Sequence, residues 1–115
     1  MLINLNLDLR LKYTAVLAAA AFWTAAGMTP ALAADADVVI DNFAFVPATV
    51  TIAAGEAVTW TNHDDTPHQV LASDKSFRSP GLDTGEHYRL VFAKPGTYGY
   101  YCSLHPYMVG TVIVH

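Results

Sequence analysis

One stretch near the end of this 115-residue chain decides its fold, and it reads Tyr101-Cys102-Ser103-Leu104-His105-Pro106-Tyr107-Met108-Val109-Gly110. Cys102 is the only cysteine of the sequence, His105 follows it by three residues, and Met108 follows His105 by three more. Thiolate, imidazole and thioether are the ligand types that copper prefers. The short spacing allows a single loop between two strands to surround one ion. The stretch therefore predicts a metal centre at one end of a β domain.

A fourth ligand comes from farther back in the chain. His68 follows the turn residues Thr66 and Pro67 and begins a segment that resumes as strand, so it can lie at the same end of the domain as the closing loop. Two imidazoles, one thiolate and a weak axial Met form the ligand set of electron-transfer copper sites. We predict that one copper ion is bound by His68, Cys102, His105 and Met108.

Each of these side chains has an ordinary explanation when it is taken alone. A single Met is most often core filling, a loop His is usually solvated, and a Cys at a strand end is usually a small buried hydrophobe. Zinc is disfavoured because a thioether is a poor ligand for it and structural zinc sites use several thiolates or imidazoles. A Cys/His hydrolase is disfavoured because no third residue orients the pair and no oxyanion site is evident. The combination favours copper.

The size of the domain also favours a metal. We expect residues 1–34 to be removed as a secretory signal peptide, which leaves an exported domain of about 80 residues. A domain of that size buries only some 60% of the surface that its unfolded chain exposes, so small exported domains usually carry disulfides or a metal. With one cysteine in the sequence, no disulfide can form within the chain. A lone cysteine in an oxidising compartment is a liability unless something occupies it. It could be a buried inert thiol, an intermolecular disulfide, a catalytic nucleophile or a metal thiolate, and the neighbouring His105 and Met108 favour the last.

Short strand signals separated by turn residues recur along the chain and predict an all-β domain. We expect strands over residues 38–40, 49–52, 57–62, 68–72, 86–92, 97–102 and 110–114, and a long loop over 73–85. In 57–62 apolar and polar residues alternate, and Lys94-Pro95-Gly96 is a strong turn signal. About seven short strands in this length predict a Greek-key β-sandwich or barrel.

The first 34 residues have the composition of a secretory signal peptide. Arg10 and Lys12 precede an uncharged run over 13–27, and the small residues Ala31-Leu32-Ala33-Ala34 follow. This order is typical of a helical signal peptide cleaved after Ala33 or Ala34. The alternative is a membrane anchor, but the uncharged run is shorter than the roughly 20 residues that a spanning helix needs. We expect a signal peptide over 1–34, a domain over 35–115, a periplasmic location and no stable membrane association.

The predicted domain is acidic. Residues 35–115 hold nine Asp and Glu against four Lys and Arg, which gives a formal charge of −5 with His neutral. So few cations argue against nucleic acid as a partner and against binding to anionic lipid. The balance suits a protein partner with a basic docking face.

The stretch from Lys94 to Val114 resembles the C-terminal signature of the plastocyanin/azurin family of blue copper proteins, the cupredoxins. Trp60-Thr61-Asn62 and Thr66-Pro67-His68 match the same family, and the two-residue gaps between Cys, His and Met resemble amicyanin. The resemblance implies one type 1 copper, with His68, Cys102 and His105 as strong ligands and Met108 as the axial one. One departure is Gln69, because the family often has an Asn there that braces the Cys loop; Asn62 or Ser103 are candidates to replace it.

Three functions are compatible with a copper site. The favoured one is a monomeric carrier that shuttles single electrons between Cu(I) and Cu(II) for redox proteins, a dehydrogenase or a c-type cytochrome. A docking patch around His105 would then consist of Pro67, Leu104, Pro106 and Tyr107. The alternative is a periplasmic copper-binding or delivery protein, although such proteins usually use Met-rich or His-rich open sites. An enzyme is disfavoured, because multicopper oxidases and copper nitrite reductases need further ligands from a second domain.

Overall fold

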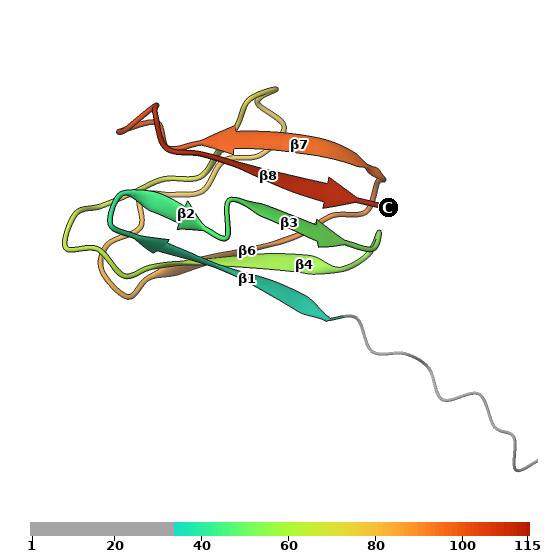
Figure 1. The fold of residues 1–115 in the computed structure, drawn as a ribbon, viewed down its shortest axis with the longest axis horizontal. Coiled ribbons are helices and arrows are strands. Elements are labelled where there is room, and N and C mark those ends of the chain that lie inside the picture. The colour runs from blue at the N-terminus through green and yellow to red at the C-terminus, as the bar shows by residue number, and fades with distance from the viewer. Residues whose placement is uncertain (1–33) are drawn as a thin grey trace, which may run out of the picture. The chain divides into compact units, whose positions relative to one another are not determined.

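The computed structural model describes residues 34–115, and they form eight strands in two sheets (Figure 1). The strands are β1 (Asp35–Asp41), β2 (Ala44–Val46), β3 (Thr49–Ile52), β4 (Ala57–Asn62), β5 (Leu71–Ala72), β6 (His87–Val91), β7 (Gly96–Tyr101) and β8 (Val109–Val114). No helix in this part of the chain has the length and hydropathy of a membrane span. The predicted signal peptide lies outside the described residues, apart from Ala34.

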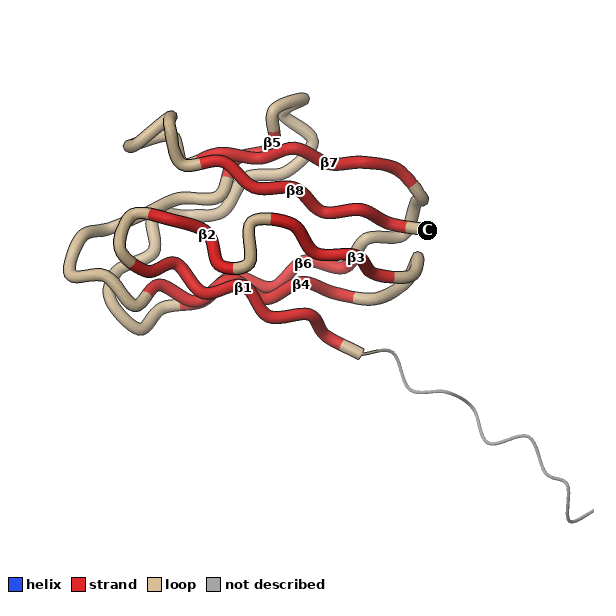
Figure 2. The backbone as a smooth tube through the Cα atoms, in the orientation of Figure 1, coloured by secondary structure: helices blue, strands red, loops and turns tan. Residues whose placement is uncertain are grey.

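The two sheets face each other as the layers of a sandwich (Figure 2). One sheet has the strand order β2-β1-β4-β6, and the other has the order β3-β8-β7-β5. The pairs β1–β4 and β3–β8 are parallel, and the remaining neighbours are antiparallel. The chain passes from one sheet to the other between β2 and β3, at Pro47, which has no N–H to offer a ladder. The expected Greek-key sandwich is confirmed.

Alternating residues of the facing strands fill the space between the sheets. On β4, Val58 and Trp60 are fully buried, as the alternation of that segment predicts. Trp60 contacts the rings of Tyr88 and Tyr100, at centroid distances of 5.8 and 5.4 Å. The buried aliphatic residues pack around these rings, so the interior is one continuous apolar core.

Two segments differ from the expected strands. Residues 68–72 form a ladder only at Leu71 and Ala72, and β2 was not predicted. The backbone of His68 instead exchanges hydrogen bonds with Leu82, and that of Val70 bonds to Ser79. The loop over 73–85 therefore folds back as the partner of this segment, which is why a full strand is not needed there.

All the segments that carry predicted ligands meet at one end of the sandwich. The ladders align the end of β1 with the end of β4, and the end of β7 with the start of β8. The β1–β2 turn, the segment after β4 and the loop after β7 lie together at the left in Figure 1.

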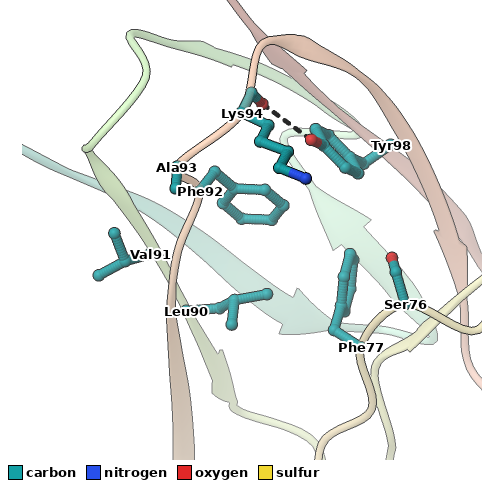
Figure 3. A pocket seen from close by; sticks show the side chains of 8 residues that line it. All are labelled: Ser76, Phe77, Leu90, Val91, Phe92, Ala93, Lys94 and Tyr98. Carbon is teal, nitrogen blue, oxygen red and sulfur yellow. Dashed lines mark hydrogen bonds between the residues drawn. The ribbon is translucent and has the colours of Figure 1, made fainter.

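Toward the other end, a shallow groove of about 320 Å³ is lined by side chains of β6, the turn after it, the loop over 73–85 and β7 (Figure 3). Its walls are mainly apolar, with Phe77, Phe92 and Tyr98 as the largest rings.

Candidate metal centre

Three of the four predicted ligands converge around one point. His68 Nδ1 lies 3.7 Å from Cys102 Sγ, and His105 Nδ1 lies 3.8 Å from the same sulfur. One donor atom from each of the three residues lies within 4.8 Å of the others, and this is the only such His, Cys, Asp and Glu group found in residues 34–115. Cys102 and His68 are fully buried, whereas His105 is partly exposed.

The closing loop is held in shape by its own backbone. The Cys102 N–H donates to the Met108 carbonyl at 3.1 Å, and the Met108 N–H donates to the His105 carbonyl at 2.9 Å. The His105 N–H donates in turn to the Cys102 carbonyl at 3.2 Å. Met108 is buried and belongs to the same apolar cluster as Cys102. Because the three residues are spaced three apart, these hydrogen bonds form two consecutive tight turns that carry the predicted metal ligands Cys102, His105 and Met108.

His68 is oriented by a carboxylate. Its Nε2 lies 2.8 Å from Asp64 Oδ2, so Nε2 is assigned the proton and Nδ1 presents its lone pair toward Cys102. Burial works against ionisation of Asp64, but the backbone N–H of Phe43, the His68 ring and the N–H of Asn42 together hold the pKa of that carboxyl below its usual 3.8. Asp64 is therefore a fixed anion behind the first imidazole.

A brace of the Cys loop is present, although Gln69 stands where the blue copper proteins that this sequence resembles often have Asn. Gln69 Oε1 accepts a short hydrogen bond from Ser103 Oγ, and its Nε2 donates to the Ser79 carbonyl at 2.7 Å. The Gln69 N–H also donates to Cys102 Sγ at 3.4 Å. Asn62 holds the segment that precedes His68 instead, since its Nδ2 donates to the carbonyls of Thr66 and Leu82. Gln69 and Ser103 together take the role expected of one Asn.

Two residues of the site, Asp64 and Phe43, were not predicted from the sequence. Asp64 reads in the sequence as part of a solvated turn, and Phe43 gives no signal of its own. The Phe43 ring stands edge-on to both imidazoles, with centroids 5.3 Å from His68 and 5.1 Å from His105. The only sequence signal for the contact between Asp64 and His68 is their spacing of four residues.

The donor set fits copper. Two imidazole nitrogens and a buried thiol, with a thioether on the same loop, are a soft and borderline set. Such a set matches the preference of copper better than that of zinc, calcium or magnesium. The other histidines, His63, His87 and His115, are exposed, as expected for solvated side chains.

Comparison with known proteins agrees with this geometry. The family model of the cupredoxin-like domain matches residues 14–114. The chain belongs to the cupredoxin-like family. Amicyanin-alpha of Methylorubrum extorquens is 39% identical over 106 residues, which are 88% of this chain and 87% of that protein. The chloroplastic plastocyanin of Tetradesmus obliquus is 40% identical over 87 residues, 61% of this chain and 57% of that one.

Solved structures of this cupredoxin family show the same fold. A purple cupredoxin from Nitrosopumilus maritimus matches with a TM-score of 0.67 and 37% identity, over 70% of this chain and all of that one. A copper-containing nitrite reductase from Thermus scotoductus matches with a TM-score of 0.68 and 32% identity, over 77% of this chain. Only 24% of the nitrite reductase is covered, so the likeness is to one part of that enzyme.

Proposed function

We propose that this protein is an exported type 1 copper protein that carries single electrons between redox partners in the periplasm. Its ligands are His68 through Nδ1, Cys102 as thiolate, His105 through Nδ1 and Met108 as the axial thioether. Copper supplies the Cu(I)/Cu(II) couple, and the protein supplies a fixed set of donors. Cleavage after Ala33 or Ala34 leaves the domain over 35–115.

The observation that carries the proposal is the placement of both Nδ1 atoms against one buried sulfur, 3.7 and 3.8 Å away. These side chains come from a closing loop and from a segment 34 residues earlier, so no local preference brings them together. Hydrogen bonds to Asp64 and Gln69 hold the first imidazole and the sulfur before any metal arrives. A prearranged site changes little between two oxidation states, which favours rapid electron transfer.

His105 is the best route for electrons to the surface. It is partly exposed, and the side chains on either side of it in the loop, Leu104 and Tyr107, are 56% and 70% exposed. Exposed apolar side chains around a redox centre form a docking patch for a protein partner. The acidic balance of the domain suits a partner whose face is basic, such as a dehydrogenase or a c-type cytochrome.

The burial of the donors argues against the alternative of copper delivery. A protein that hands its metal on needs donors that a partner can reach, but His68 and Cys102 are fully buried. We therefore expect slow loss of copper to chelators and a fast, reversible redox couple. Rapid loss with an irreversible couple would favour delivery instead.

The decisive experiment is reconstitution. The full-length chain is expressed in a bacterium, recovered from the periplasm, analysed for its N-terminal residue and titrated with Cu(II). We expect an N-terminus at Ala34 or Asp35, one copper per chain and an intense visible thiolate-to-copper band. Cys102→Ser and His68→Ala should abolish the band, whereas His63→Ala, a control on an exposed imidazole, should leave it unchanged. A colourless wild-type product would contradict the proposal.

A further inference from the structure

The β1–β2 turn next to the site has an unusual backbone. Asp41 pairs with Ala44, so the turn consists of only two residues, and both have positive φ, +50° at Asn42 and +58° at Phe43. Two-residue hairpins favour this left-handed pair because its twist matches that of the strands, but the second position normally holds Gly. A bulky aromatic residue there is rare. Something in the surrounding structure must hold Phe43 in place.

The Asp64 carboxylate is what holds it. Its Oδ1 accepts the Asn42 N–H at 2.7 Å, and its Oδ2 accepts the Phe43 N–H at 3.0 Å. The same Oδ2 lies 2.8 Å from His68 Nε2. Asp64 is itself fixed at both backbone ends, since its N–H donates to Asn62 Oδ1 and its carbonyl accepts from Thr84 Oγ1. One side chain thus ties the turn directly to a metal-ligand candidate.

The turn places one ring against both imidazoles. The Phe43 ring meets His68 at an interplanar angle of 85° and His105 at 89°, while the two imidazoles are 5.0 Å apart. Besides the Phe43 ring, the His68 imidazole is held by its hydrogen bond to Asp64. Within the described residues, the only side-chain polar contact of His105 is that of its Nδ1 with Cys102. The Tyr107 ring also lies edge-on to His105, but its centroid is 6.2 Å away and its side chain is 70% exposed. Edge-on aromatic contacts are favourable, so the nearer Phe43 ring, at 5.1 Å, is a side support of the exposed ligand from the β1–β2 turn.

We propose that Phe43 is a positioning residue, held by Asp64 in a left-handed turn so that its ring keeps His105 against Cys102. This rests on the proposed function in so far as His105 is taken to be a copper ligand. The ring blocks one direction in which the His105 imidazole could swing away from the sulfur. Retention of the metal and order of the His105 ring should therefore both depend on a residue that donates nothing to the metal.

Copper retention tests the proposal in the loaded protein. Loss of copper to excess EDTA should be about tenfold faster in Phe43→Gly and Phe43→Asn, two residues that accept positive φ but lack the ring. Phe43→Tyr should keep the wild-type rate, and so should Val46→Ala, an exposed position on the same hairpin. Equal rates in wild type, Phe43→Gly and Phe43→Asn would overturn the proposal.

The apoprotein gives a readout that does not need the metal. In ¹⁵N NMR of the histidine rings, Phe43→Gly should broaden the His105 signals, because the ring gains freedom to move, while those of exposed His87 stay unchanged. A His105 ring as ordered in the variant as in wild type would overturn the proposal. If wild type binds no copper in a blue site, the proposed function fails, and this measurement still decides whether Phe43 positions His105.

The part played by Asp64 is tested by a double variant. Asp64→Asn should speed copper loss in wild type, but less so in the Phe43→Gly background, because part of its effect passes through the ring. Fully additive effects would show that Asp64 acts only through His68 and would overturn its role in the turn.

Discussion

The aromatic interior and the metal-binding end of this sandwich are stabilised by different kinds of interaction. In the interior, Trp60 Nε1 and Tyr100 Oη are buried with no hydrogen-bond partner, and the packing of aromatic and aliphatic side chains holds the two sheets together. At the metal end, every polar side-chain atom of the buried residues Asn62 and Gln69 takes part in a hydrogen bond. The interior therefore depends on volume and shape, whereas the metal end depends on donors and acceptors. A substitution should be costly in one region for a reason that does not apply in the other.

The largest effect should come from added volume in the interior. A Cβ at Gly110 would overlap the ring of Tyr100, which is itself packed between Phe45 and Trp60 and has nowhere to move. Overpacking of this kind costs about 3 kcal/mol. Gly110→Ala should lower the free energy of unfolding by that amount, measured by urea denaturation of the apoprotein.

Gly81 offers the matched control for this change. Its φ is not in the left-handed region, and a Cβ there would meet nothing within 4 Å. Gly81→Ala should leave the urea midpoint unchanged or slightly higher. Equal midpoints for the two variants would mean that the Tyr100 ring does not occupy the space over Gly110.

At the metal end, the corresponding test removes hydrogen bonds instead of adding volume. The Asn62 side chain donates to the carbonyls of Thr66 and Leu82 at 2.9 and 2.8 Å and accepts the Asp64 N–H at 2.9 Å. Asn62→Ala leaves two backbone carbonyls and one backbone N–H without their hydrogen-bond partner, which should lower the free energy of unfolding by about 2 kcal/mol. Because the same bonds fix the segment before His68, the variant should also lose copper faster.

Thr61 provides the comparison for Asn62, since it is the preceding residue of β4 and makes no side-chain hydrogen bond in the described part of the chain. Thr61→Val keeps its shape and should change neither the unfolding free energy nor the rate of copper loss. If Asn62→Ala behaved like Thr61→Val, hydrogen bonding would not be what holds this end of the sandwich.

The same contrast explains what the sequence could predict. The ligand loop and the alternating strands were predictable because their signals are local: three residues between Cys102 and His105, or a period of two along β4. The residues that hold the candidate ligands in place were not predictable, because their contacts are distant in the sequence. Asp64 reaches Asn42 and Phe43 across 22 and 21 residues, and the contact exists only because β1 and β4 run parallel and end together.

Local patterns also miss elements that are too short or too irregular to show a period. β2 has three residues, and 68–72 satisfies most of its backbone groups with the loop over 73–85. The exchange of one bracing Asn for Gln69 with Ser103 likewise needs the two side chains in space, since 34 residues separate them.

The smallest effect at neutral pH should come from deleting a polar atom of the interior. The Tyr100 hydroxyl has no hydrogen-bond partner, so Tyr100→Phe removes a buried, unpaired group and should change the urea midpoint at pH 7 little. In alkaline solution the two proteins should separate. Burial raises the pKa of Tyr100 from an ordinary value of 10 to about 12, although the neighbouring Trp60 indole acts in the opposite direction.

A raised pKa means that the folded state resists losing this proton while the unfolded state releases it. The stability linked to Tyr100 is therefore fully present below pH 10 and is lost as the pH rises from 10 toward 12, by an amount on the order of 2 kcal/mol. The Tyr100→Phe variant has no hydroxyl proton to release and so does not lose this stability. Between pH 10 and 12 it should therefore unfold at a higher urea concentration than wild type. Parallel curves across that range would show that the hydroxyl is hydrated or paired in the folded protein. The interior would then also be stabilised in part by hydrogen bonds, as the metal end is.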